Sequence, residues 1–328
     1  MPSLVFREES ESTLAMLCGK ALGLEFHSAA LLGGGMFNTT YLVHLGGHED
    51  VVLRLGAVNR HLLMPFEQYL MWTEWEVYNR CRALGLPFPE ILYMDTSRKL
   101  VDRDYMFVRY VPGQAMSTVK LSPENYDALC ADIGACTRQM HTLTAPKFGR
   151  VYEVMTDGGY DRWSEAVLHE LEAWKTVGVP AHVLEDADLC RMETALARAV
   201  PLLDEIRTPV LVHNDLWMGN VLVRPDSDGY KLGLILDGDR AIYADPELEF
   251  SGHRVIHDEE AFLRAYGSAP SDSLPARTRR GLYHMLTQTW HSYVFFEEYA
   301  MPDYGARAVT FILDELKTLE SRLDKLSL

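Results

Sequence analysis

In the first third of the chain, short apolar runs alternate with polar turns. Runs of strand length are separated by glycine, proline and charged residues, and they occupy 31–32, 39–43, 51–55, 91–93 and 105–111. Two longer segments, 12–22 and 66–84, repeat apolar residues at helical spacing, and a glycine follows each of them. This pattern predicts a small mixed lobe of strands and helices over residues 1–111.

Beyond residue 113 the apolar spacing becomes mainly helical. A helix is predicted at 122–143, where Pro123 follows Ser122 at the first helical position. Further helices are predicted at 163–174 and 186–206, with three or four more after residue 247. The sequence therefore predicts an α+β fold of two lobes, in which residues 112–328 form the larger, mainly helical one.

The stretch 213–220, His-Asn-Asp-Leu-Trp-Met-Gly-Asn, follows the apolar run 210–212 directly. It places Asp215 and Asn220 five residues apart on a loop, and Asp237 follows the next apolar run. Phosphoryl transfer needs a carboxylate that orients a hydroxyl, and oxygen ligands that hold Mg²⁺ on a nucleotide. A surface turn with a capping Asp would explain Asp215 alone, but it does not explain the whole set.

Each polar side chain of this stretch has an expected role. Asp215 is the candidate catalytic base, which orients the hydroxyl and accepts its proton late in the reaction. The oxygens of Asn220 and Asp237 are the candidate Mg²⁺ ligands. His213 belongs to the same catalytic loop, where we expect it to brace the loop by hydrogen bonds rather than to transfer a proton.

A glycine loop and one arginine are the candidates for phosphate contacts in the first lobe. Gly34 and Gly35, followed by Asn38, lie between two predicted strands, so backbone N–H groups there can approach phosphates. Arg54 lies within an apolar strand, where a charge is costly unless it is paired. Glu74 on the following helix is the expected partner, although the helix phase leaves Glu76 open.

Composition limits the partners and the compartment. The net charge of −16 disfavours nucleic acid as a partner and would attract a cationic small substrate. No run of about eighteen apolar residues predicts a membrane span, and the first residues do not resemble a signal peptide. Five scattered cysteines fit reduced thiols in a cytoplasmic protein. The sequence leaves the oligomeric state open.

The second lobe offers side chains that could receive a cationic substrate. The acidic candidates, of which we expect fewer than half to serve, are Glu247, Glu249, Asp258, Glu259, Glu260, Glu297 and Glu298. Aromatic candidates on a late predicted helix are Trp290, His291 and Tyr293, although helical spacing also fits core packing.

The 213–220 motif, with Leu236-Asp237 and Ala244-Asp245-Pro246, resembles the aminoglycoside phosphotransferase and choline/fructosamine kinase-like family. The resemblance runs from about residue 31 to about residue 250 and implies a protein-kinase-like fold. By resemblance, Asp215 matches the catalytic Asp and Asn220 and Asp237 match the magnesium ligands. Arg54 stands where the family has its phosphate-binding Lys or Arg, and Glu74 matches the acidic partner of that residue.

The resemblance also implies a nucleotide hinge at the end of the strand 105–111. Adenine would bond there to backbone groups near Arg109 and Val111. Two residues depart from the family pattern, because Asn214 stands where Gly is usual and Trp217 where His is frequent.

The predicted function is a kinase that transfers the γ-phosphate of ATP or GTP, with Mg²⁺, to a hydroxyl of a small polar molecule. An aminoglycoside or other antibiotic, or an amino sugar, is the expected kind of acceptor. Two alternatives stay open at this point: a non-catalytic nucleotide-binding regulatory module and a metal-dependent phosphohydrolase.

Overall fold

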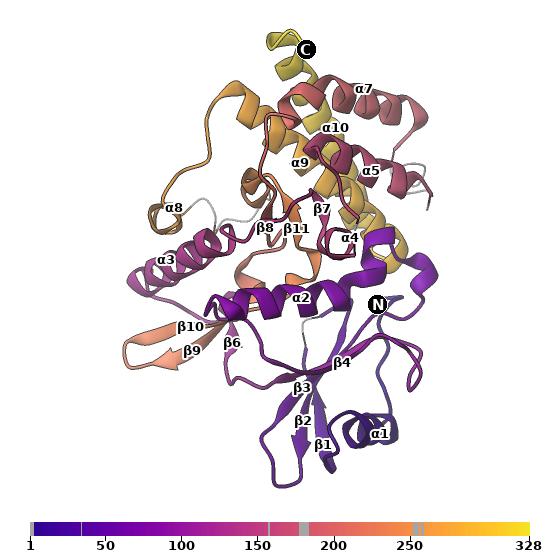
Figure 1. The fold of residues 1–328 in the computed structure, drawn as a ribbon, viewed down its shortest axis with the longest axis vertical. Helices are drawn as coiled ribbons and strands as arrows, with labels where there is room; N and C mark the ends of the chain where they lie inside the picture. The colour runs from indigo at the N-terminus through magenta and orange to yellow at the C-terminus, as the bar shows by residue number, and fades with distance from the viewer. Residues whose placement is uncertain (1–2, 34, 157, 177–183, 252–255, 257–258) are drawn as a thin grey trace.

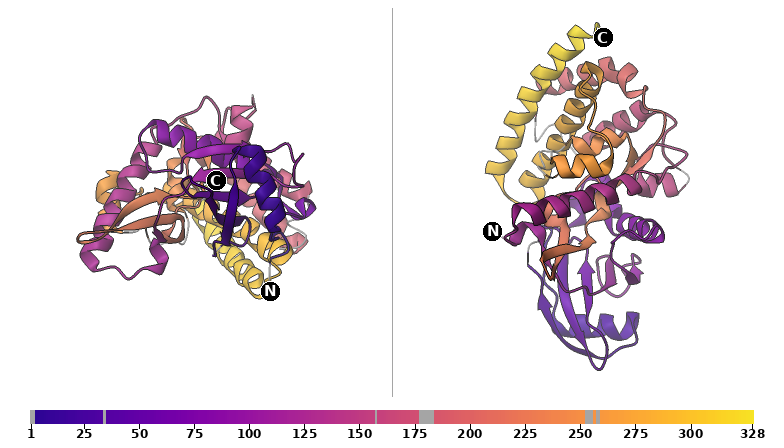
Figure 2. Two further views of the ribbon diagram at one scale, coloured as in Figure 1. Left: turned by 90° about the horizontal axis from the view of Figure 1, so that it is seen from below. Right: turned by 90° about the vertical axis from the view of Figure 1, so that its left-hand side faces the viewer.

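In this computed structural model the described residues are 3–33, 35–156, 158–176, 184–251, 256 and 259–328. They form a sheet lobe and a larger helical lobe, which follow one another along the long axis of the molecule (Figure 1). Figure 2 shows the C terminus at the end of the helical lobe that lies away from the sheet lobe. The predicted α+β two-lobe fold is confirmed.

The sheet lobe is one antiparallel sheet with helix α1 (Glu11–Ala21) beside it. Its strands lie in the order β1-β2-β3-β5-β4, with the bounds β1 Phe26–Leu31, β2 Thr39–Leu45, β3 Val51–Leu55, β4 Ile91–Asp95 and β5 Tyr105–Arg109. Strand β3 is flanked by β2 and β5, and Arg54 pairs in register with Thr40 and Met106.

The alternation of β3 decides where Arg54 points. Val51, Leu53 and Leu55 are buried in the core that the sheet shares with α1. Successive side chains of a strand point to opposite faces, so Arg54 lies on the other face of the sheet. That face meets helix α2.

Helix α2 (Leu70–Ala83) lies between the two lobes (Figure 1). The predicted helix 66–84 is wrong at its start, because Pro65–Tyr69 form a 3₁₀ turn and Tyr69 has a φ of −125° that interrupts the helix. A second 3₁₀ turn, Arg60–Leu62, lies earlier in the connection, whose structure the sequence did not predict. On its buried side α2 contributes Val77 to a core otherwise built mainly from the helical lobe.

The helical lobe contains most of the helices and two small sheets. Its helices are α3 Pro123–Met140, α4 Val151–Met155, α5 Trp163–Thr176, α7 Asp186–Leu203, α8 Glu260–Tyr266, α9 Leu274–Tyr293 and α10 Pro302–Lys325. The small sheets have the orders β10-β9-β6 and β7-β11-β8. Their strands are β6 Gln114–Ala115, β7 Gly149–Arg150, β8 Val210–Val212, β9 Val221–Asp226, β10 Gly229–Ile235 and β11 Ile242–Ala244.

The crossing between the lobes is short. Strand β5 ends at Arg109, two residues before the predicted end, and Pro112 lacks the N–H that a ladder needs. β6 then pairs with β9 of the helical lobe. A Cβ on Gly113 would lie 2.5 Å from the Leu222 side chain, so the close approach requires glycine there. These features support our proposed division between residues 1–111 and 112–328.

In the described part of the chain, no helix has both the length and the apolar character needed to cross a membrane. The five cysteines carry free thiols, and three of them, Cys18, Cys81 and Cys130, are buried.

Candidate active site

The predicted catalytic loop emerges from the fully buried strand β8, which pairs with β11. His213 follows β8 and is 0% exposed. Its backbone N–H donates to Glu249 Oε2 at 2.8 Å, and its Nε2 donates to the Leu236 carbonyl at 3.0 Å. These bonds hold the loop to the segment before Asp237, as expected of a bracing residue.

Asn214 has a left-handed backbone, with a φ of 61°. Non-glycine residues are uncommon there, but Asn adopts this region more readily than most. This conformation explains why the family pattern has glycine at the position. The Asn214 side chain donates to the Arg240 carbonyl at 3.3 Å, which ties the loop to the turn after Asp237.

Asp215 and Asn220 are in direct contact. The Asn220 Nδ2 donates to Asp215 Oδ2 at 2.9 Å and to the Asp215 carbonyl at 2.8 Å. The backbone carbonyl of Asn220 in turn accepts the Leu236 N–H at 2.8 Å. The loop thus orients the carboxylate with an amide and places both residues beside the start of the Asp237 turn.

Asp237 ends the run after β10 and also has a left-handed backbone, with φ 56° and ψ 49°. Its N–H donates to the hydroxyl of Tyr78 at 3.0 Å, and that hydroxyl donates to Glu74. Gly238 fits beneath α2 because a Cβ there would lie 2.8 Å from Val77. The hydroxyl of Tyr78, a residue not predicted from the sequence, therefore fixes the backbone of Asp237 and the side chain of Glu74.

Arg54 joins the two lobes by ion pairs. Its guanidinium lies 2.7 Å from Asp237 Oδ1 and 3.2 Å from Glu74 Oε2. The predicted pairing with Glu74 is confirmed, whereas Glu76 pairs with Arg80 on the same helix. Burial raises the pKa of Glu74 to about 7, and the Arg54 cation opposes that rise.

Two charged residues after Asp237 extend this network. Asp239 is buried, and burial together with Glu74 and Asp237 raises the pKa of its carboxyl well above the ordinary value. Arg240 lies 4.4 Å above the Trp290 ring. Burial disfavours the charge of the Arg240 guanidinium, but the nearby carboxyl groups of Asp215, Asp239 and Glu67 raise its pKa. Arg240 also lies 4.0 Å from Asp239 Oδ1, and its local sequence did not predict its place beside Asp215.

The predicted nucleotide residues lie on the sheet lobe and at the crossing. Gly34 falls outside the described residues, while Gly35 and Asn38 lie in the loop between β1 and β2. The Arg109 side chain is exposed and pairs with Glu90 and Glu49. Its N–H donates to the Glu90 carbonyl at 2.8 Å, so at Arg109 adenine would have to use the carbonyl. Val111 follows outside the strand.

Most of the acidic residues expected to receive a substrate have partners within the protein. Glu249 accepts the His213 N–H, Glu247 pairs with Arg280, and Glu260 pairs with Arg264. Glu298 is fully buried, Glu259 bonds to Tyr126, and Asp258 lies outside the described residues. Trp290 and Tyr293 are also buried, as core residues at helical spacing are.

The donor set fits Mg²⁺. Oδ1 of Asp237 pairs with Arg54, which leaves its second oxygen for a cation, and Asn220 uses its nitrogen toward Asp215, which leaves its oxygen. Within the described residues, no three His, Cys, Asp or Glu side chains are grouped to hold a metal. Mg²⁺ suits such a site, because it commonly takes one or two protein ligands and completes its shell with phosphates and water.

Comparison with known proteins gives a family match and several similar folds. Residues 28–283 match the phosphotransferase enzyme family. No curated protein sequence matches the chain significantly. Among solved structures, a thermostable mutant of aminoglycoside phosphotransferase APH(4)-Ia with AMP-PNP and hygromycin B superposes with a TM-score of 0.62 at 17% identity, over 93% of this chain and 98% of that one.

Two further structures are similar over nearly their whole length. A predicted fructosamine-3-kinase from Thermobifida fusca has a TM-score of 0.63 at 18% identity, covering 94% of this chain and 100% of that one. APH(2")-IIia with GDP and kanamycin has a TM-score of 0.59 at 17% identity, covering 96% and 99%. At these identities the likeness establishes the kinase-like two-lobe fold.

Proposed function

Because the chain belongs to the phosphotransferase enzyme family, it is a small-molecule kinase with a hydroxyl acceptor, and we propose that it uses ATP or GTP with Mg²⁺. We propose further that the acceptor is a polar molecule such as an aminoglycoside, another antibiotic or an amino sugar. Asp215 is the proposed catalytic base, Asn220 and Asp237 are the proposed magnesium ligands, and Arg54 is the proposed phosphate contact.

One observation carries this proposal. The side-chain Nδ2 of Asn220 donates to Asp215 Oδ2 at 2.9 Å. The backbone carbonyl of Asn220 accepts the N–H of Leu236, the residue before Asp237. These bonds tie the segment before Asp237 to the loop of Asp215 and Asn220, which supports a site where a proposed base and two proposed oxygen ligands act on one phosphoryl group. A protein that only binds nucleotides has no need of an oriented carboxylate there.

The chain's own groups would act mainly by positioning and charge. Asp215 orients the acceptor hydroxyl and takes its proton late in the transfer. Arg54 exchanges its contact with Asp237 for the phosphates, and Glu74 keeps its guanidinium in place. Asp237 and Asn220 would hold Mg²⁺, which when bound would neutralise charge on the phosphates. Gly35 and Asn38 would cover the phosphates, and the carbonyl of Arg109 and the N–H of Val111 would meet the base.

The ligands of similar folds support the choice of nucleotide and acceptor. The APH(4)-Ia complex contains AMP-PNP with hygromycin B, and the APH(2")-IIia complex contains GDP with kanamycin. Adenine and guanine nucleotides thus both occur on this fold, and we keep both for this chain. Both acceptor ligands are antibiotics, which supports the proposed acceptor class.

The direct test is Asp215→Ala, assayed with ATP and GTP over a panel of aminoglycosides, other antibiotics, amino sugars and amino alcohols. We expect loss of phosphate transfer with nucleotide affinity largely retained, because Asp215 is proposed to contact the acceptor and not the nucleotide. Asp226→Ala is the matched control, since Asp226 is exposed and forms a surface ion pair with Lys231 at 3.2 Å. Full transfer by Asp215→Ala would refute the assignment.

The same assay separates the alternatives. Tight nucleotide binding without transfer to any acceptor would favour the regulatory module. Phosphate release faster than transfer, in the absence of an acceptor, would favour the phosphohydrolase.

A further inference from the structure

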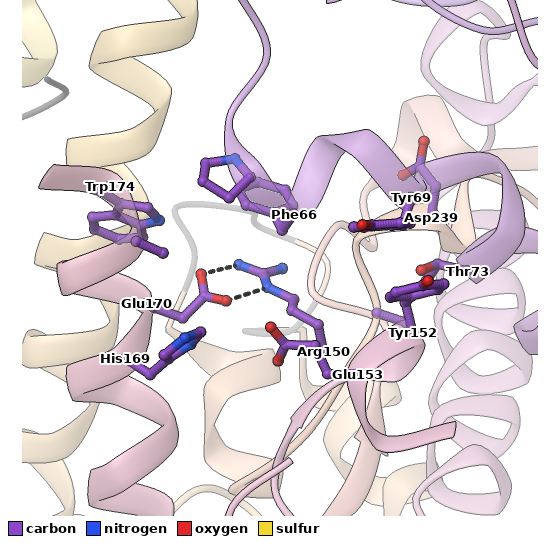
Figure 3. A pocket seen from close by; sticks show the side chains of 13 residues that line it. Phe66, Tyr69, Thr73, Arg150, Tyr152, Glu153, His169, Glu170, Trp174 and Asp239 are labelled. Carbon is purple, nitrogen blue, oxygen red and sulfur yellow. Dashed lines mark hydrogen bonds and ion pairs between the residues drawn. The ribbon is translucent and has the colours of Figure 1, made fainter. Parts of the chain in front are cut away.

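A cavity of about 240 Å³ lies beside helix α2, away from the residues assigned to catalysis. Its walls come from the 3₁₀ turn before α2, the start of α2, the β7–α4 segment, α5 and the turn after Asp237. Figure 3 shows the side chains of Phe66, Trp174, Arg150 and Tyr152 arranged around it. The volume corresponds to roughly eight waters at about 30 Å³ each, so a small organic molecule fits.

One buried donor faces this cavity without a partner. Trp174 is 2% exposed, and its Nε1 has no hydrogen-bond acceptor among the described residues. In Figure 3 this nitrogen lies on the side of the indole that faces the pocket. A buried N–H without an acceptor is costly, so its position favours a ligand that supplies one.

The charge of the lining is predominantly negative. Arg150 is satisfied by Glu170, to which it donates at 2.9 and 2.8 Å, and it lies 4.0 Å above the Phe66 ring. Glu153 and Asp239 add two further carboxyl groups to the same lining. Burial raises the pKa of the Glu153 carboxyl, so this group would gain from a cationic partner.

Aromatic rings complete the walls. Tyr69 and Tyr152 stack with their ring centres 3.7 Å apart, and Phe66 and Trp174 line other parts of the cavity. The faces of aromatic rings attract cations, and they also bury the apolar body of an organic ligand. Rings, the Glu153 carboxyl and one N–H donor together suit a small organic ammonium ion that also carries a hydrogen-bond acceptor.

Asp215 does not line the cavity, although a smaller hollow that shares Arg150, Glu170 and Trp174 with it reaches Asn214, the residue before Asp215. Phe66 meets Trp290 edge to face, with ring centres 5.7 Å apart, and Trp290 lies beneath Arg240, whose charge is next to Asp215. A molecule in the cavity would therefore have Phe66 and Trp290 between it and Arg240.

The cavity nevertheless touches the elements that carry the candidate phosphate and metal groups. Tyr69 precedes α2, and Thr73 is the residue before Glu74 on that helix. Asp239 follows Asp237 by two residues. A ligand in the cavity would therefore touch Thr73 and Asp239, which lie within two residues of Glu74 and Asp237, the two ion-pair partners of Arg54.

We propose that this cavity is a second small-molecule site, which binds an organic ammonium ion and changes the affinity of the proposed nucleotide site. The coupling rests on the proposed function, because it requires a nucleotide bound at Arg54. The binding itself does not, so the two can be tested separately.

The probes are 4-methoxybenzylamine, which is an ammonium ion with an ether acceptor, and the neutral 4-methoxybenzamide. Neither has a hydroxyl, so neither can accept a phosphate. Calorimetry with the full-length protein should show the amine binding at least about tenfold more tightly than the amide, since only the amine pairs with the carboxyls. Saturating amine should change the affinity for AMP-PNP by about fivefold or more.

Three variants locate the binding. Glu153→Gln should weaken the amine by about tenfold and leave the amide unchanged, because only a charge is removed. Trp174→Phe should weaken both probes by about three- to tenfold through loss of one N–H donor. Glu172→Gln is the matched control on the helix of Trp174, because Glu172 is exposed and forms a surface ion pair with Lys175 at 2.8 Å. It should leave both affinities unchanged.

Several results would overturn the proposal: no amine binding at about 1 mM, equal binding of amine and amide, or equal loss in Glu172→Gln and Glu153→Gln. Competition of the amine with a phosphorylated acceptor, without any change in AMP-PNP affinity, would instead identify the cavity as the acceptor site and would also overturn it. If no acceptor is phosphorylated while the amine binds as described, the kinase proposal fails and this site stands.

Discussion

Replacing Tyr78 with phenylalanine should weaken both the fold and the nucleotide site. The Tyr78 hydroxyl donates to the buried Glu74 carboxylate and accepts the N–H of Asp237 at 3.0 Å, while its ring is 1% exposed. Phenylalanine keeps the ring and removes both bonds. A bond to a charged group contributes about 1.5–3 kcal/mol and one between neutral groups about 0.5–1.5 kcal/mol. We expect the free energy of unfolding to fall by about 2–4 kcal/mol.

The same change should act on nucleotide binding through Asp237. This residue holds a left-handed backbone at φ 56°, a conformation that L-residues adopt at a cost of roughly 1–2 kcal/mol. Without the Tyr78 hydroxyl its N–H has lost its acceptor, and the carboxylate is less firmly placed. Affinity for Mg²⁺–AMP-PNP should therefore fall by about tenfold, which corresponds to about 1.4 kcal/mol.

Urea unfolding and a calorimetric titration with Mg²⁺–AMP-PNP measure the two effects. Tyr304→Phe is the matched control, because the Tyr304 side chain is 49% exposed and its ring contacts Arg307. The control should stay within about 0.5 kcal/mol of the parent protein. If Tyr78→Phe is as stable as the control and binds nucleotide as well, the bridging role assigned to this hydroxyl is wrong.

Two further predictions follow from the same structure. Glu74→Gln should lower nucleotide affinity and Glu76→Gln should not, since only Glu74 contacts the arginine of the site; equal losses in a nucleotide titration would contradict the pairing. Iodoacetamide at pH 8 should modify the exposed Cys190 well before Cys18 and Cys81, because burial shields their thiols and raises their pKa to about 11 and about 12. Mass spectrometry of the modified sites checks the order, and rapid modification of Cys81 in the native protein would refute it.

Local sequence signals were sufficient for much of the candidate site. The catalytic loop follows a run of three apolar residues, so its emergence from a buried strand could be predicted. Arg54 in an apolar strand required a buried partner, and Glu74 was the carboxylate on the inner side of the next helix. The α+β two-lobe division followed from the change of apolar spacing after residue 113.

The residues that were missed depend on contacts between distant segments. Tyr78 looks like a core aromatic, and its link to Asp237, 159 positions away, is created only by the packing of α2 on the turn. Its spacing of four residues from Glu74 was the one available signal. Acidic residues such as Glu249 looked available for a substrate, but the fold turns this one inward to the His213 backbone. Strand ends were also uncertain, because the last residues before Pro112 are apolar without pairing in the sheet.

The anchoring of α2 has a mechanical consequence. Val77 and Cys81 of this helix are buried in a core built mainly from the helical lobe, whereas Met71 at its start packs on Met106 and Val108 of the sheet, so both lobes hold the helix. A motion that moves the sheet away from the Asp237 turn would therefore stretch the ion pair between Arg54 and Asp237 and leave the guanidinium paired with Glu74. We expect this ion pair to resist such an opening, and a bound polyphosphate that gives Arg54 new anionic partners would remove that resistance.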